Sequence, residues 1–277
     1  MRTSLNITNK LTKLAEMAGD SVFQILEFDE LTGGNNVDSA IKFKFMKDAG
    51  IKLKQIRIIL EDSAVKLESG ALSYLKGDID LQNKVGGVLG FGKKLINSKL
   101  TGETLFKPRY EGTGEIFLEP SFGHYALLEL ENEEVIVDDG VFYACEDTVE
   151  IGSAMQKSIS SMLLGNEGLF QTKISGSGIV VVEIPVPENE IFKCRLSNDT
   201  LKVDGNFAIL RTGGIEFSVE KSSKSVIGST TSGEGFLNVY KGTGEVWLVP
   251  TKVVYDKLES TGLNTMTNPS GDRDNEQ

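Results

Sequence analysis

The feature that most constrains this chain is a stretch that it contains twice. Residues 110–120 read YEGTGEIFLEP and residues 240–250 read YKGTGEVWLVP, with seven of eleven positions identical. A more divergent copy, ISGSGIVVVEI, occupies residues 174–184. The first glycines of the three copies, Gly112, Gly176 and Gly242, are 64 and 66 residues apart. A period near 65 residues with strand-like sequence predicts three β units that bury their apolar faces against one another.

Each unit is predicted to open with a tight turn. LESGAL (67–72), VDDGVF (137–142) and VDGNF (203–207) align on Gly70, Gly140 and Gly205. Asp-Gly is typical of two-residue hairpins, because the turn needs a positive φ that glycine accepts. The GTG and GSG pairs predict a bulge or a close backbone approach. We expect antiparallel strands in all three units, at about residues 61–130, 131–195 and 196–256.

The segments before the first unit have patterns of their own. Residues 1–20 are predicted to form a short N-terminal helix, because Leu11, Leu14 and Ala18 continue one helical face from Ile7 and Gly19-Asp20 can end it. Residues 22–28, 41–46 and 51–60 are predicted strands. In the second of these, apolar residues alternate with lysines.

The domain organisation follows from these patterns. Residues 21–260 are predicted to form a single all-β domain that contains the three repeats. Residues 261–277 are polar and are predicted to be a disordered tail.

The recurring Gly-Glu-Gly-Leu-Phe type segments and Gly-x-Gly strands, together with QILEF (24–28) and ESGALSY (68–74), resemble the altered-inheritance-of-mitochondria protein family. The resemblance covers roughly residues 22–256. It implies a fold like that of the tryptophan RNA-binding attenuator protein, which is a β-helix-like arrangement of antiparallel strands. It implies no reaction, because bacterial members of the family carry no settled biochemical activity.

Net charge, cysteine content and the lengths of the apolar runs indicate which partners and which cellular compartment to expect. The net charge of −11 repels nucleic acid and anionic membranes at long range. The two cysteines, Cys145 and Cys194, form no C-x-x-C motif and fit a reducing compartment. No apolar run approaches the length of a membrane span. We expect an acidic cytoplasmic protein without a membrane span, for which nucleic acid is a disfavoured partner.

The usual catalytic patterns are missing from the sequence. A cupin-type metal site needs several imidazoles, and the chain has one histidine, His124. The motif G-x-S-x-G does not occur. Residues 87–94 nearly match a phosphate-binding loop, but Lys94 stands where a hydroxyl residue would hold Mg²⁺. We therefore expect no enzyme activity, no cofactor and no metal site.

One acidic position recurs in all three units, at Glu103, Glu167 and Glu234. In one interpretation each carboxylate accepts hydrogen bonds from its own glycine-rich turn, and Phe106, Phe170 and Phe236 fill equivalent core positions. In the other, the three carboxylates converge on a pseudo-threefold axis and bind a cation or retain a proton.

A basic segment stands out against the acidic background of the chain. It contains Lys42, Lys44, Lys47, Lys52, Lys54 and Arg57. In one interpretation it binds an anionic ligand or nucleic acid. In the other, the lysines lie on an exposed strand and block edge-to-edge association.

The polar connectors of the three units also contain apolar residues, among them Leu163, Leu164 and Val226. They either form a common face for self-association or pack beneath their own units.

We expect a non-catalytic scaffold or protein-interaction protein that forms a homo-oligomer or binds a protein partner. The alternative is a module that binds an anionic ligand or nucleic acid through residues 42–57.

Overall fold

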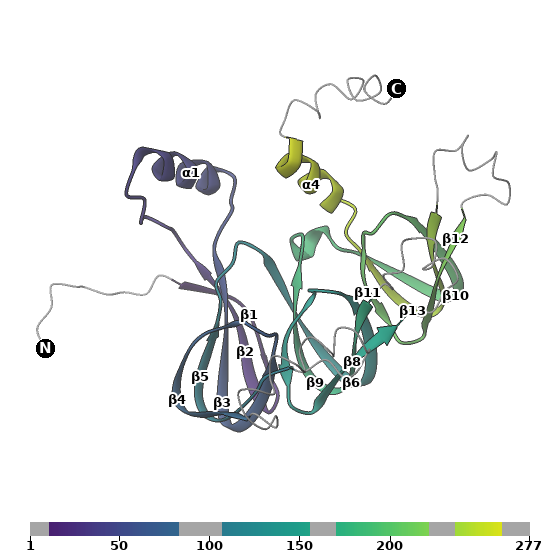
Figure 1. The fold of residues 1–277 in the computed structure, drawn as a ribbon, viewed down its shortest axis with the longest axis horizontal. Coiled ribbons are helices and arrows are strands. Elements are labelled where there is room, and N and C mark those ends of the chain that lie inside the picture. Colours follow the sequence, from purple (N-terminus) through teal and green to yellow (C-terminus); the bar gives the residue numbers. More distant parts are fainter. Residues whose placement is uncertain (1–10, 83–106, 156–169, 222–235, 262–277) are drawn as a thin grey trace, which may run out of the picture. The chain divides into compact units, whose positions relative to one another are not determined.

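A computed structural model describes residues 11–82, 107–155, 170–221 and 236–261. Within these residues the chain is mostly antiparallel β-strand, with two α-helices and one 3₁₀ turn (Figure 1). The predicted all-β class with a short helix is confirmed. The β-helix-like arrangement and the threefold repeat in space stay predictions, as does the disordered tail, which lies beyond the described residues.

The chain divides into two compact units, where the sequence predicted one domain over residues 21–260. The first unit comprises Met1–Met155 with Phe170–Ile184, and the second comprises Gln156–Leu169 with Pro185–Gln277. Each unit is described by itself.

The first unit is built from nine strands and one helix. They are β1 (Leu11–Ala18), β2 (Ser21–Phe28), α1 (Val37–Asp48), β3 (Lys54–Leu67), β4 (Leu72–Gln82), β5 (Arg109–Leu118), β6 (His124–Asp138), β7 (Phe142–Glu146), β8 (Val149–Met155) and β9 (Phe170–Ile184). β1 pairs with β2 and β2 with β3; β3 also pairs with β5 and β7. β4 pairs with β5, and β9 pairs with β6, β7 and β8.

The core of the first unit follows from strand alternation. Phe23 and Ile25 on β2 and Ile56 and Ile58 on β3 point to one face and are at most 5% exposed. Ile116 on the neighbouring β5 is fully buried beside them. Because side chains alternate across a strand, these runs place one apolar set on the inner face of the sheet.

The second unit is smaller. It contains the 3₁₀ turn η1 (Glu188–Glu190), β10 (Phe192–Asp204), β11 (Ala208–Thr212), β12 (Ile215–Lys221), β13 (Phe236–Leu248) and α4 (Lys252–Thr261). β13 pairs with β10, β11 and β12. Its buried cluster comprises Leu196, Val203, Ala208, Ile215, Tyr240 and Val246. The Tyr255 hydroxyl on α4 donates to Glu190 of η1 at 2.8 Å.

The turn glycines have the predicted positive φ, but their turns do not make hairpins. The φ angles of Gly70, Gly140 and Gly205 are 85°, 81° and 84°. The turn at Gly70 joins β3 to β4, and these strands pair with opposite ends of β5: Lys66 with Arg109 and Leu72 with Leu118. The turns at Gly140 and Gly205 likewise join strands that both pair with β9 or with β13.

This connection requires a bent strand. Between Arg109 and Leu118 a straight strand would span about 30 Å. The six residues from Lys66 to Leu72 reach at most about 20 Å. β5 must therefore bend, and the break in its register opposite β3 marks the bend, between the pairs Leu60–Gly114 and Ser63–Gly112. The tight turn is a corner of a rolled sheet rather than a hairpin.

A hydroxyl group that was not among the predicted features stabilises each bend. At the register break β3 contains Asp62, with φ 53°, and its N–H donates to Thr113 Oγ1 at 3.0 Å. The N–H of Asn132 donates to Ser177 Oγ at 2.9 Å, and that of Asn198 donates to Thr243 Oγ1 at 2.9 Å. The middle residue of each Gly-x-Gly therefore accepts from a left-handed Asp or Asn. The sequence signal for this hydrogen bond is the Thr or Ser between the two glycines of each Gly-x-Gly.

Thr243→Val is expected to lower the free energy of unfolding of the second unit by about 1 kcal/mol, because valine keeps the shape and removes one hydrogen bond. The bond lies at the surface, so water replaces part of it. Trp247, the single tryptophan, lies on β13 and reports this unit by fluorescence in urea. Thr200→Val, on the exposed side of β10, is the matched control; an equal loss there would contradict the assignment.

Two predicted elements are wrong. Residues 11–18 form strand β1 instead of the end of a helix, because they pair with β2 from Leu11–Phe28 to Ala18–Val22. Tertiary pairing overrides the weak helical pattern. Gly19-Asp20 is the turn between these strands, where Gly19 N–H donates to Ser21 O at 3.0 Å. Residues 1–10 lie outside the described residues.

Residues 41–46 belong to helix α1 rather than to a strand. Asn36 accepts from the N–H of Ser39, and Ser39 Oγ accepts from the N–H of Asn36, which makes a complete capping box. Lys44 pairs with Asp48 one turn later at 2.9 Å. These local contacts specify a helix, and the alternation of apolar residues with lysines in 41–46 misled the sequence analysis.

Candidate functional site

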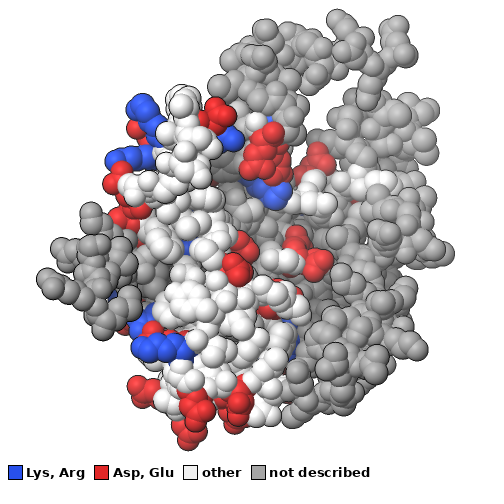
Figure 2. All heavy atoms as spheres, turned by 60° about the vertical axis from the view of Figure 1, so that its left-hand side comes forward, with Lys and Arg blue, Asp and Glu red and all other residues white. Residues whose placement is uncertain are grey.

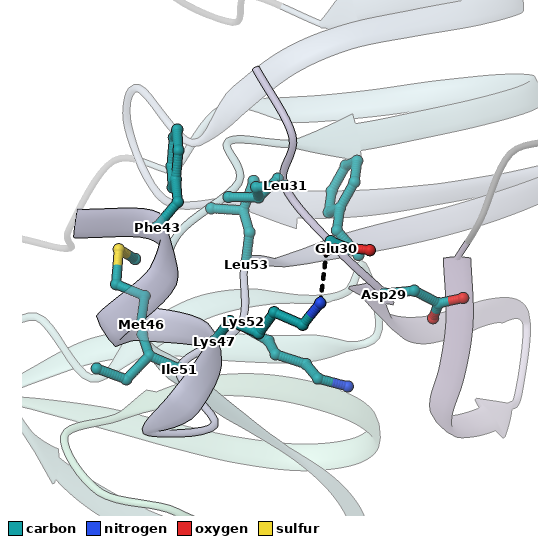
Figure 3. A pocket seen from close by; sticks show the side chains of 10 residues that line it. Asp29, Glu30, Leu31, Phe43, Met46, Lys47, Ile51, Lys52 and Leu53 are labelled. Carbon is teal, nitrogen blue, oxygen red and sulfur yellow. Dashed lines mark hydrogen bonds and ion pairs between the residues drawn. The ribbon is translucent and has the colours of Figure 1, made fainter. Parts of the chain in front are cut away.

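A small hollow lies between α1 and the ends of β2 and β3 (Figure 3). It offers about 50 Å³ of space to water, which is room for a few water molecules rather than for an organic ligand. Its lining comprises Phe28, Asp29, Glu30, Leu31, Phe43, Met46, Lys47, Ile51, Lys52 and Leu53. Figure 3 shows apolar side chains of α1 on one side and Leu31 and Leu53 on the other.

Ion pairs close the rim of this hollow. Lys47 Nζ lies 2.7 Å from Glu30 Oε1, as the dashed line in Figure 3 marks, and Lys52 Nζ lies 2.9 Å from Glu27 Oε1. The hydrogen bond from each ammonium group to its glutamate raises the pKa of Lys47 and of Lys52. Both groups are exposed, so these pairs orient the rim and add little stability.

The outer side of α1 is apolar and uncovered. Val37, Ile41 and Phe45 follow one another at four-residue intervals and are 74%, 49% and 66% exposed. We call these three residues the α1 stripe. No residue of α1 is buried. In Figure 1 the helix lies beyond the strand ends of its unit, on two extended connectors. The contacts of the helix with the sheet therefore leave the α1 stripe free.

The predicted basic residues do not form one positive surface. Lys42 and Lys44 lie on α1, where Lys44 pairs with Asp48, and Lys52 pairs with Glu27. Arg57 on β3 pairs with Glu115 on β5 at 2.8 Å. Figure 2 shows blue and red side chains interspersed on this side of the molecule rather than a continuous blue patch.

Lys54 lies inside the sheet rather than on its surface. The residue is 9% exposed, and its Nζ donates to the carbonyl oxygens of Lys52 and Gly123 at 3.3 Å each. Burial lowers the pKa of this ammonium group. Its backbone also forms a bridge to Ser121. This contact ties the start of β3 to the loop before β6.

Arg57 belongs instead to a row of side chains that crosses the outer face of the sheet. Its guanidinium carbon lies 5.8 Å from the ring centre of Phe117, and Phe117 stacks on Tyr74 with centroids 4.5 Å apart. On the other side Arg57 donates to Gln24 Oε1 at 3.1 Å. No local sequence pattern predicts this row, because neighbours across β4, β5, β3 and β2 are distant in sequence.

Several predicted residues lie outside the described residues. Glu103, Glu167 and Glu234 are among them, as are the near phosphate-loop segment 87–94 and the apolar connector residues. Phe236 is the first residue of β13. Convergence of the three glutamates and a common connector face stay predictions.

The remaining candidate groups lie in strands. His124 is the first residue of β6, opposite Ile184 on β9. Burial raises the pKa of the Cys145 thiol to about 12, so it stays protonated at neutral pH. In the described ranges, no three His, Cys, Asp or Glu residues are grouped as metal ligands would be. Neither described helix is long and apolar enough to cross a membrane.

Comparison with known proteins adds a family and a fold. A family model described as mitochondrial biogenesis AIM24 matches residues 47–251. An uncharacterized protein of Streptococcus pyogenes serotype M6 is 24% identical over 215 residues, which cover 75% of this chain and 85% of that protein. The X-ray structure of a Streptococcus pyogenes protein has a TM-score of 0.56 at 21% identity, covering 76% of this chain and 94% of that chain. That structural likeness concerns the fold alone.

Proposed function

We propose that this protein, which belongs to the mitochondrial biogenesis AIM24 family, is a non-catalytic scaffold that binds another protein through the α1 stripe. The observation that carries the proposal is a fully capped helix on which the three apolar side chains of the α1 stripe are at least 49% exposed. Exposed apolar surface of this kind is typical of interaction sites.

The charges around the stripe favour a protein as the occupant. Asp38, Lys42, Lys44, Lys47 and Asp48 give α1 a near balance of acidic and basic groups. A polyanion or an anionic lipid surface binds best where cations gather on one face. Lys44, Lys47 and Lys52 form ion pairs with Asp48, Glu30 and Glu27. This is also why the alternative of anionic-ligand binding gains no support here.

A photo-crosslinking experiment tests the proposal. Phe45, at 66% exposed, is replaced by p-benzoylphenylalanine in the full chain, and cells are irradiated. We expect discrete adducts whose added mass is protein, and we expect Ile41→Asp to reduce their yield at least fivefold. The matched control places the same residue at Phe122, which is 42% exposed in the same unit and should give none of these adducts. Adducts with lipid or nucleic acid alone, or yields unchanged by Ile41→Asp, would overturn the proposal.

A further inference from the structure

In the first unit, the edge of strand β3 is covered by another strand, β7. β7 pairs with β3, with Glu146, Cys145 and Ala144 opposite Val65, Lys66 and Leu67. Glu68 N–H donates to Tyr143 O at 2.8 Å and Asp147 N–H donates to Ala64 O at 3.0 Å. The pairing leaves Ala144 and Cys145 0% exposed and Glu146 3% exposed.

β4 occupies on β5 the position that β7 occupies on β9. Leu72, Tyr74 and Leu75 oppose Leu118, Phe117 and Ile116. Phe142, Ala144 and Cys145 oppose Val182, Val181 and Val180, with the same register shift after the first pair. Within the described part of the chain, however, β4 pairs with β5 alone. Tyr74 and Leu75 are therefore 52% and 39% exposed, where their counterparts on β7 are fully buried.

β10 in the second unit carries the complementary edge. Leu201 and Lys202 oppose Tyr240 and Val239 on β13, just after a register shift. Val65 and Lys66 of β3 oppose Tyr110 and Arg109 on β5 in the same way. β3 is covered at these residues by β7, whereas β10 has β13 as its partner among the described strands and no other.

We infer that β10 of one molecule pairs with β4 of a second copy of this chain, in the register that joins β3 to β7. Leu201 then lies opposite Lys76, Lys202 opposite Leu75, and Val203 opposite Tyr74. The two edges differ, so the contact is head-to-tail and extends into chains or closes into a ring. This inference goes beyond the proposed function, because it does not involve α1.

A lysine at the same position of both edges supports the same register. Lys66 Nζ reaches past β7 to the carbonyl oxygens of Asp147 and Val149, at 2.7 and 2.9 Å. Lys202 holds the corresponding place on β10. By the same correspondence, Asp147 and Val149 match Gly77 and Ile79 on β4. Lys202 would exchange its exposed pair with Glu220, at 2.8 Å, for the carbonyl oxygens of these two residues.

Proline substitution at each edge tests the inference. Tyr143 of β7 and Asp147, the residue after β7, direct backbone groups towards β3. By alternation, the corresponding Ser73, Leu75 and Gly77 of β4 direct theirs to the open side. Leu75→Pro removes a donor from this side and spares the pairing with β5. Lys202→Pro does the same on β10. We expect light scattering to give multiples of 30.1 kDa for the native chain and a single copy for either variant.

A mixture of the two variants separates head-to-tail pairing from any other contact. Each variant keeps one intact edge, so equal amounts should form complexes of two copies and no larger species. Leu81→Pro is the matched control, because β8, which occupies the place of that part of β4, does not pair with β3. A native chain of one copy at all concentrations, variants that assemble like it, or a mixture that stays single would each overturn the inference.

A crosslink keeps the inference testable if a proline variant does not fold. Leu75→Cys combined with Lys202→Cys places two thiols directly opposite across the proposed contact, at a separation that a disulfide can span. Mild oxidation should give a ladder of covalent multimers on a non-reducing gel. The single cysteine variants, which retain Cys145 and Cys194, should not give it. Absence of the ladder would count against the contact.

Discussion

Gly112→Ala is expected to destabilise the first unit by about 2–5 kcal/mol, combining positive-φ strain with overpacking. Gly112 has φ 143°, and a Cβ there would lie 2.0 Å from the carbonyl oxygen of Asp78 on β4. That oxygen belongs to paired backbone and cannot move aside without breaking the β4–β5 register. The bend that brings the two ends of β5 within reach of one turn depends on this close approach.

Two spectroscopic probes distinguish the unfolding of the first unit from that of the second. Far-ultraviolet circular dichroism in urea follows the strands of both units, and Trp247 fluorescence follows the second unit by itself. The variant should show an earlier loss of dichroism. Gly152→Ala on β8 is the matched control, because Gly152 has no positive φ and no atom within 4 Å of its added Cβ. A Gly112→Ala protein as stable as the control would contradict the account of the bend.

Glu146→Ala is expected to lower the stability of the first unit by about 2–5 kcal/mol. The carboxylate is 3% exposed and accepts from the N–H of Ser21 and of Ile179, both at 2.9 Å. Alanine leaves two buried donors without partners, at about 1–3 kcal/mol each. Gly19 and Gly178 leave room for the carboxylate, since a Cβ on either would lie within 2.7 Å of it. Through these two hydrogen bonds, Glu146 connects the β1–β2 turn to β9.

Two further variants define this effect. Glu146→Gln should be less harmful than alanine, because its amide oxygen still accepts one bond while its NH₂ group faces the second donor. Glu150→Ala, an exposed glutamate on β8, should change the stability by less than about 0.5 kcal/mol. Urea unfolding followed by circular dichroism measures all three. Equal stabilities for Glu146→Ala and Glu150→Ala would show that the hydrogen bonds of the buried carboxylate do not stabilise the first unit.

Backbone conformation could be predicted where it depends on a residue and its immediate neighbours in the chain. Gly70, Gly140 and Gly205 were assigned positive φ because the turn sequence demands it, and the strands of residues 22–28 and 51–60 followed from their apolar residues. The capping box at Asn36 and Ser39 was equally readable, yet the alternation of Ile41, Phe43 and Phe45 led to a predicted strand. Short alternating runs do not separate a strand from a helix when neither face is buried.

The sequence by itself determined the β class, the positions of the tight turns and the three glycine-bracketed strands, because these depend on residues close together in the chain. Only the tertiary structure decided which strands are neighbours. Pairing energy comes from partners far apart in sequence, so residues 11–18 became a strand and the Asp-Gly turns became corners. The same pairing buried Lys54 and joined Arg57 to Phe117. It also left β4 and β10 each with one edge that no other described strand covers, which no local pattern in the sequence indicates.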